Sequence, residues 1–423
     1  MLIFDMKNKT LFFWTLLIFA LSFTASFAAE RPGELSAALR SSWLSNPSIR
    51  AAVLRYEAAV LEAGSEGALS PGELAVADSI IGEGATDSAM ELSQPLEING
   101  ARGARKKAAL SRAEERRMEL LIQVEDVSLL VKELYWDLVR LESELSLKKA
   151  NELYFRNLRT MILRQIDAGT LPGFHLLRAD AALSSAVQDV RTVELELSEK
   201  RGAFVLAAGT PFEYPSGFSP ETFVPDDFSS RFPPLFSPVK DHPSLLLPGI
   251  RAETAEREIK AERASLYPDL DLIMRKETFD DRGGAGLRLR VPVFGWGKAS
   301  GKMRSLRKIS ESERVLYEGA AGDLDQSLQS ALASLFTYES VIMEYDGHVL
   351  KNAAELVRVV EKAYSKGAAG FLDLMDAKKN QTDASAARIA MSVEYLKAYA
   401  RLERCYGVTS KEYVGFVSER RKK

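Results

Sequence analysis

The chain has 423 residues, a formal net charge of -3 at pH 7, three histidines and one cysteine. This acidic balance disfavours nucleic acid as a partner, and so few histidines and thiols argue against a zinc or thiol-based site. The position of Cys405 excludes both a disulfide framework and a lipid-anchoring cysteine at a mature N-terminus.

Residues 1–28 have the pattern of a secretory signal peptide. Its parts are two lysines, an apolar run and two small residues at signal-peptidase spacing: Lys7 and Lys9, 11–23, Ser26 and Ala28. The run is too short for a spanning helix, and no other stretch approaches the roughly 20 apolar residues that one needs. The mature chain is therefore expected to be exported without a transmembrane helix.

The rest of the chain is predicted to be two copies of one unit. Prolines and glycines recur at offsets of 196 to 198 residues: Pro47 with Pro243, Pro71 with Pro268, Pro95 with Pro292, Gly100 with Gly297, Gly169 with Gly367, and Gly209 with Gly407. This spacing defines a first repeat (29–209), a linker (210–243), a second repeat (244–407) and a C-terminal tail (408–423).

In the first repeat a short helix and two strand candidates, 73–81 and 89–97, precede a long helical pattern. Apolar residues step alternately by four and three from Leu120 to Leu145, which is a heptad seam. Such a seam predicts left-handed supercoiling against a neighbour. A helix over residues 102–168 would be on the order of 100 Å long, and it is expected to return as a second helix ending at Gly209.

The linker carries half of the sixteen prolines and six phenylalanines. No helix survives such a run. Its aromatic content predicts packing against the folded part, because disordered linkers are poor in aromatic residues.

The second repeat follows the same order, and its strand candidates, 267–277 and 286–294, alternate clearly. One face is apolar and carries Leu270, Leu272, Met274, Leu287, Leu289, Val291 and Val293. Alternation of this length fits a hairpin on a soluble core. It also fits strands of a membrane β-barrel, with the apolar side to lipid and the charged side to a wet lumen; export favours the second interpretation. The first-repeat strands alternate less clearly.

Four strands cannot close a barrel, and an open edge in hydrocarbon leaves backbone groups unpaired. A barrel therefore requires an oligomer. Pro95 and Pro292 are expected near the strand ends on the lumen side, where they stop ladder pairing. Gly100 and Gly297 are expected to let the backbone turn into the long helices.

These features together resemble the TolC-type outer membrane efflux proteins. The motifs that carry the resemblance are QPLEINGARGARKKAA (94–109), AGTLPGFHLLRAD (168–180) and AYSKGAAGFLDLMDA (363–377). It implies a mainly α fold with a small β part: a homotrimer whose twelve-stranded outer membrane barrel continues into a twelve-helix periplasmic coiled-coil barrel. The linker and tail would form a belt around its middle. The first motif leans toward the heavy-metal, CzcC-like branch.

The resemblance also implies which residues form the periplasmic constriction. Asp373 and Asp376 match the aspartates of the family's periplasmic constriction, and Tyr364 matches a tyrosine that helps to hold the closed state. Two positions depart from the family, since Ala369 stands in place of a latch arginine and His175 in place of an aspartate. Read locally, both aspartates lie in the first turns of a helix, where the dipole favours acidic residues.

Two turns are expected to face a periplasmic adaptor protein, and they consist of Gly169, Thr170, Leu171, Gly367, Ala368 and Ala369. The local interpretation is plain helix-ending geometry.

The function implied is a passive exit duct for an adaptor and an inner-membrane pump, without cofactor or metal. A duct for polypeptide secretion and a non-conducting periplasmic coiled-coil scaffold are the alternatives. No convergent nucleophile, base or metal set points to an enzyme.

Overall fold

The computed structural model describes residues 33–81, 85–215, 218–223, 241–277, 283–292 and 296–422. The expected signal peptide, most of the second half of the linker, and Val293 lie outside them. The chain forms two compact units, one made of 51–123 and 240–323 and the other of the remaining segments. Each unit takes residues from both sequence repeats, so a repeat is not a spatial domain. Among the described helices, none combines the length and apolarity needed to cross a membrane.

One unit contains the strands. Its elements are α3 (Pro47–Glu66), β1 (Glu73–Ile81), β2 (Ala85–Pro95), the start of α4 (Ala101–Asp167), α7 (Pro243–Ala264), β3 (Asp269–Glu277), β4 (Gly283–Arg290) and the start of α8 (Trp296–Glu344). The repeat is visible in α3 and α7, since each begins with a proline at its first helical position, where proline is well tolerated. The side chains of Asn46 and His242 accept hydrogen bonds from backbone N–H groups two residues later.

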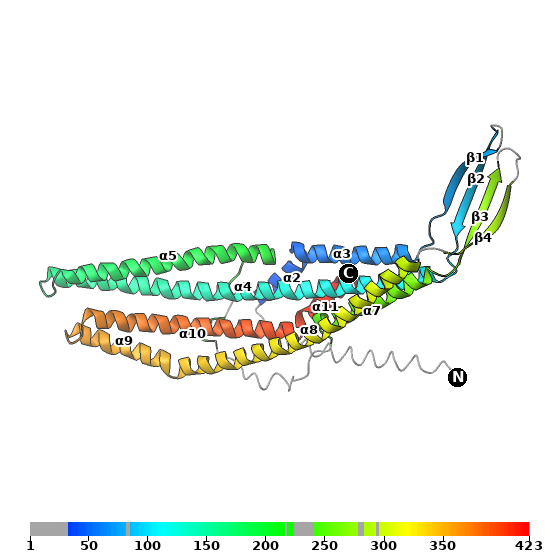
Figure 1. Cartoon of the computed structure of the whole chain (residues 1–423). Helices are drawn as coiled ribbons and strands as arrows, with labels where there is room; N and C mark the ends of the chain where they lie inside the picture. The colour runs from blue at the N-terminus through cyan, green and yellow to red at the C-terminus, as the bar shows by residue number, and fades with distance from the viewer. Residues whose placement is uncertain are drawn as a thin grey trace. The chain divides into compact units, whose positions relative to one another are not determined.

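The four strands form one antiparallel sheet in the order β1-β2-β3-β4 (Figure 1). β1 forms over its whole predicted length in spite of its weak alternation, whereas β4 ends at Arg290, before the predicted end of its candidate. The register places apolar residues opposite one another on a single face, as in the pairs Leu74 with Leu92 and Leu272 with Leu287.

The other unit is helical. It comprises α2 (Gly33–Ser45), most of α4, α5 (Phe174–Ala208), the end of α8, η2 (Tyr345–Val349), α9 (Leu350–Ser365), α10 (Phe371–Cys405) and α11 (Val408–Lys422). α5 runs back along α4, and α10 runs back along α9, so each forms a hairpin (Figure 1). The predicted long helix of the first repeat agrees with α4 to within one residue at each end.

The heptad seam of α4 is confirmed, because its eight apolar residues from Leu120 to Leu145 are all buried. In the second repeat Leu328, Leu335 and Ile342 are buried in the same way. The seam then meets η2, a π-helical turn in which no residue is buried. The continuous second helix that the sequence predicted is therefore interrupted at this point.

The described part of the linker packs through its aromatic residues, as predicted. Phe212 lies 5.4 Å from Tyr135, and Phe218 lies 5.4 Å from Trp136, between ring centroids. At the other end of the chain, the predicted tail is the helix α11. Its Tyr413 meets Trp43 of α2 edge to face at 5.8 Å.

Candidate functional site

The two hairpin turns have the same backbone geometry. Gly169 and Gly367 both have a left-handed φ, of 72° and 71°. In each turn the glycine N–H donates to the carbonyl three residues back, and the next residue, Thr170 or Ala368, donates to the carbonyl five residues back. This pair of backbone hydrogen bonds is the Schellman motif that ends helices. The helix-ending geometry expected of the two turns is thus confirmed, while contact with an adaptor stays a prediction.

The turn residues are accessible. Thr170 and Ala368 are exposed with both glycines, whereas Leu171 and Ala369 are half-buried. Two exposed tips of matching geometry are therefore present in each chain.

Asp373 and Asp376 lie at the start of α10, on its exposed side. Phe371 and Leu374, which are nearly fully buried, anchor this turn in a core formed with α4 and α5. Oδ2 of Asp373 accepts a hydrogen bond of 2.8 Å from the backbone N–H of Gly370 and so caps the helix. One carboxylate therefore has a capping role within the chain, while both side chains remain exposed.

Tyr364 is half-buried at the end of α9. Its hydroxyl group is buried and has no hydrogen-bond partner in the described part of the chain, and burial raises its pKa. Its side chain packs against the same core as Phe371.

A second polar group lies close to this core and was not predicted. The ammonium of Lys378 in α10 lies 4.7 Å above the ring of Tyr154 in α4, a cation–π contact. Burial lowers the pKa of Lys378, although the Glu361 carboxylate opposes this shift. Nothing in the sequence distinguishes Lys378 from the surface lysines around it, because its partner lies more than two hundred residues away.

His175 lies in the first turn of α5 and is half-buried. Its ring stacks on that of Phe174 at 4.2 Å, and its Nδ1 is buried without a hydrogen-bond partner among the described residues.

The first strand–helix joint is tightly bonded. Pro95 is the last residue of β2, and Gly100 has a left-handed φ of 76°. Between them Glu97 also has a positive φ, of 48°, and its carboxylate accepts two hydrogen bonds from Arg105, of 2.9 and 3.1 Å. Ile98 donates its N–H to Asp269, which ties the joint to β3.

The second joint is built differently, and the role expected of Gly297 is corrected. Gly297 is the second residue of α8 and is not among the left-handed glycines. Because a helical residue cannot redirect the chain, Gly297 does not make the turn into α8. Pro292 follows the end of β4, as expected, and residues 293–295 lie outside the described part.

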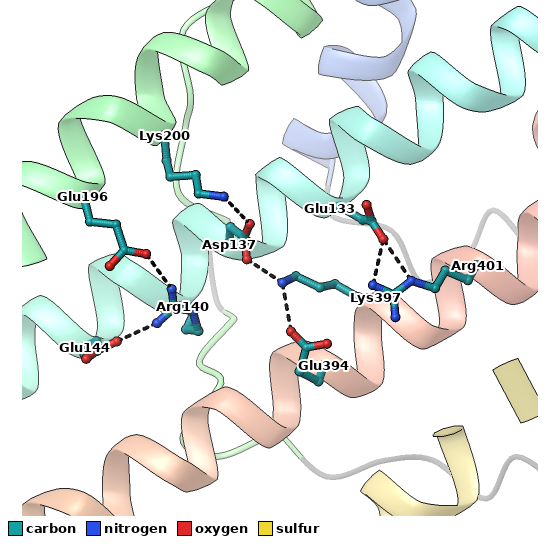
Figure 2. A network of polar contacts seen from close by, with 9 residues as sticks. All are labelled: Glu133, Asp137, Arg140, Glu144, Glu196, Lys200, Glu394, Lys397 and Arg401. Atoms are coloured by element: carbon teal, nitrogen blue, oxygen red, sulfur yellow. Dashed lines mark hydrogen bonds and ion pairs between the residues drawn. The ribbon is translucent and has the colours of Figure 1, made fainter. Parts of the chain in front are cut away.

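A network of ion pairs ties α4 to α5 and α10 (Figure 2). Asp137 of α4 accepts hydrogen bonds from Lys200 at 3.0 Å and from Lys397. Burial opposes ionisation of Asp137, but the bonds from Lys397 and Lys200 outweigh it and hold its pKa below the ordinary value. Further pairs, such as Arg140 with Glu196 at 3.0 Å and Arg401 with Glu133 at 2.9 Å, extend the network along α4.

A buried arginine joins η2 to the linker. Arg388 of α10 is only 1% exposed and donates two hydrogen bonds of 2.8 Å to the carboxylate of Asp346 in η2. It also donates to the carbonyl oxygens of Pro220 at 3.0 Å and Phe223 at 2.5 Å. All of these bonds are charge-assisted, which makes them stronger than neutral ones.

Within the described residues, no three histidine, cysteine, aspartate or glutamate side chains are placed so as to hold a metal ion.

Comparisons with known proteins identify a matching family model and several solved structures of similar fold. Residues 240–408 match the family described as outer membrane efflux protein, and no curated protein shows significant similarity. The fold is similar to VceC of Vibrio cholerae, with 16% identity over 89% of this chain and 96% of that chain and a TM-score of 0.74. CmeC of Campylobacter jejuni gives 14% identity, 92% and 89% coverage and a TM-score of 0.78. The open state of MtrE of Neisseria gonorrhoeae gives 19%, 88% and 89%, and 0.72.

The matches bear out the predicted fold class and the resemblance to outer membrane efflux proteins. They support a location in the outer membrane with a periplasmic portion. The heavy-metal branch stays a prediction.

Proposed function

We propose that this chain is the exit duct of a tripartite efflux system, which conducts substrates passively from an inner-membrane pump and its periplasmic adaptor to the exterior. The observation that carries the proposal is the sheet. It has one apolar and one charged face. Its two outer strands, β1 and β4, each have one edge that pairs with no described strand of the chain.

The apolar face is the part that would meet lipid. Nine large apolar side chains on it or just beyond it are 37–65% exposed: Leu74, Val76, Met90, Leu92, Leu272, Met274, Leu287, Leu289 and Val291. A soluble protein rarely exposes so large a contiguous apolar surface. Strands of eight to eleven residues also match the roughly 9–11 that a tilted membrane strand needs.

The opposite face suits a water-filled passage, since its charges are paired across strands. Arg288 lies 2.5 Å from Glu91, and Arg290 lies 2.7 Å from Asp271. Three copies would join β4 of one chain to β1 of the next, closing twelve strands and leaving no edge in the membrane. This amphipathic sheet counts against the scaffold alternative, which would need no charged inner face.

In such a trimer Asp373 and Asp376 would supply six carboxylates at the periplasmic entrance. Rings of carboxylates favour cations. The exposure of both side chains agrees with this role, and the capping bond of Asp373 occupies one oxygen only.

Conductance in planar bilayers tests the proposal. We expect cation-selective channels that divalent cations block, and we expect Asp373→Asn/Asp376→Asn to conduct more with less selectivity and weaker block. Asp383→Asn, an exposed aspartate further along α10, is the matched control and should behave as wild type. If neither wild type nor the double variant conducts, or the protein is a monomer in buffer without detergent, the duct is ruled out.

We propose metal cations as the substrate, because the motif at residues 94–109 resembles the heavy-metal branch of the family. Secretion of polypeptides is the alternative. A deletion strain that becomes sensitive to heavy-metal salts, but not to drugs, would support it. Sensitivity to drugs alone would reject it.

A further inference from the structure

Both long helices begin with a cluster of basic residues. Residues 101–113 of α4 and 296–310 of α8 each contain five lysines or arginines and no acidic residue. Helix N-termini favour acidic side chains, because the dipole is positive there. Helix formation therefore does not explain these clusters.

The two repeats show which of these cations have a structural partner. Arg105 and Lys302 occupy equivalent positions, 197 residues apart, and each pairs with a glutamate of the preceding helix: Arg105 with Glu66 at 3.1 Å and Lys302 with Glu262 at 2.8 Å. These two cations tie helices together.

Lys107 and Arg304 are also equivalent at the offset of 197. Both are exposed, and in the described part of the chain no carboxylate forms an ion pair with either. The chain thus keeps a free cation at the same place in both repeats, although most positions have diverged between the copies.

Both cations lie near the end of a long helix that is joined to the sheet. Lys107 lies six residues into α4 and Arg304 eight into α8, or roughly 9 and 12 Å along each helix. Side chains of a helix lean toward its N-terminus, which here is the end joined to β2 or β4. A lysine or arginine stem reaches several ångströms further, and a headgroup layer is only roughly 5–8 Å thick.

We propose that Lys107 and Arg304 bind the phosphate groups of anionic phospholipids in the membrane leaflet next to the long helices. Arginine can bind a phosphate through two parallel hydrogen bonds and lysine as a point charge. The exposed Lys106 and Arg307 add positive charge to the same two helix starts. The inference rests on the proposed function, because it takes the apolar sheet face to be in lipid.

Lipid retention tests the inference. The protein is reconstituted in nanodiscs of phosphatidylcholine mixed with phosphatidylglycerol, and the phospholipids that stay bound are counted by native mass spectrometry. Wild type should be enriched in phosphatidylglycerol, and Lys107→Gln/Arg304→Gln should lose about fivefold of the enrichment for each cation removed. Arg191→Gln/Lys351→Gln removes two exposed cations from the helical unit and should retain the lipid as wild type does.

Three results would overturn the inference. They are equal retention of both lipids by wild type, unchanged enrichment in Lys107→Gln/Arg304→Gln, and thermal stabilisation by inorganic phosphate as large as that by phosphatidylglycerol, which would assign the site to free phosphate. If the protein conducts in phosphatidylcholine but shows no lipid preference, only this inference is refuted. If the protein does not insert into the bilayer at all, the proposed duct is refuted as well.

Discussion

The two helical hairpins start from the same pattern and differ at one turn. In the first, α4 is an unbroken helix of 67 residues, whereas in the second η2 separates α8 from α9. The repeat offset is 197 at Gly100 and Gly297 but 198 at Gly169 and Gly367, so the second helix carries one additional residue. A π-helical turn holds one more residue than an α-helical turn, because its bonds close five residues apart instead of four.

The turn therefore preserves the seam. Leu145 corresponds to Ile342 before η2 at an offset of 197, and Ile162 corresponds to Val360 after it at 198, and all four are buried or half-buried. Without η2, every inward residue beyond the insertion would be rotated by about 100°. A helix can therefore gain a residue and keep its packing when one turn accommodates that residue.

Deletions give the sharpest test of this comparison. Removing His348 from η2 should yield a continuous α-helix in register with the first repeat and cost less than about 2 kcal/mol. Removing the equivalent Ala150 from α4 should rotate Phe155, Leu158 and Ile162 out of the core, and at about 2–5 kcal/mol for each large apolar side chain this exceeds typical stability. Circular dichroism and trimer yield measure the effect of both deletions. Two equally damaging deletions would show that η2 does not accommodate the additional residue.

Arg388 tests what holds the interrupted hairpin. Arg388→Met should lower the free energy of unfolding by about 3 kcal/mol, because the Pro220 and Phe223 carbonyls and the Asp346 carboxylate lose their donor. Guanidinium unfolding gives the value. Arg358→Met, which removes an exposed arginine paired with Glu355, should change it by less than about 1 kcal/mol. Equal effects would show that the buried bonds contribute nothing.

Asp137 ties α4 of the first hairpin to both α5 and α10, and its contribution to stability depends on pH. Asp137→Asn should destabilise by about 2 kcal/mol near neutral pH. Since the folded pKa of Asp137 lies below its ordinary 3.8, its contribution is present above that value and is lost as pH falls through the folded pKa. The stability difference between wild type and variant should therefore shrink in acid. A difference that is constant with pH would refute the ionic explanation.

The strand–helix joints give the smallest effect. Gly100→Ala should cost about 1 kcal/mol, since alanine disfavours the left-handed φ at that position. Gly297→Ala should stabilise by several tenths of a kcal/mol, because alanine is the better helix former. Melting temperatures of the two variants compare the joints; changes of the same sign would mean that the joints are alike.

Periodic features were predictable from the sequence, and pairings between distant residues were not. The bounds of α4 followed from its seam and from Gly100 and Gly169, which have the backbone conformations that end or begin a helix. β1 forms although it alternates poorly, because β2 supplies the register of a complete antiparallel partner. The change of offset from 197 to 198 was visible in the sequence, but it gave neither the position of η2 nor its geometry.

The contacts of Arg388 show why part of the site escaped prediction. Its partners come from the linker and from a helix forty-two residues earlier, and no local pattern marks an arginine as buried. The same holds for Tyr154 and Lys378, whose contact needs α4 and α10 to be packed together.

The pairing of β2 with β3 has a consequence for how the chain matures. Pro95 is opposite Asp271, so the centre of the sheet joins the two halves of the polypeptide. During synthesis and translocation, β1 and β2 emerge long before β3. Until β3 pairs with β2, the sheet is incomplete and its apolar face is exposed to water. Contacts so distant along the chain close slowly, and we expect this interval to require a periplasmic holding chaperone.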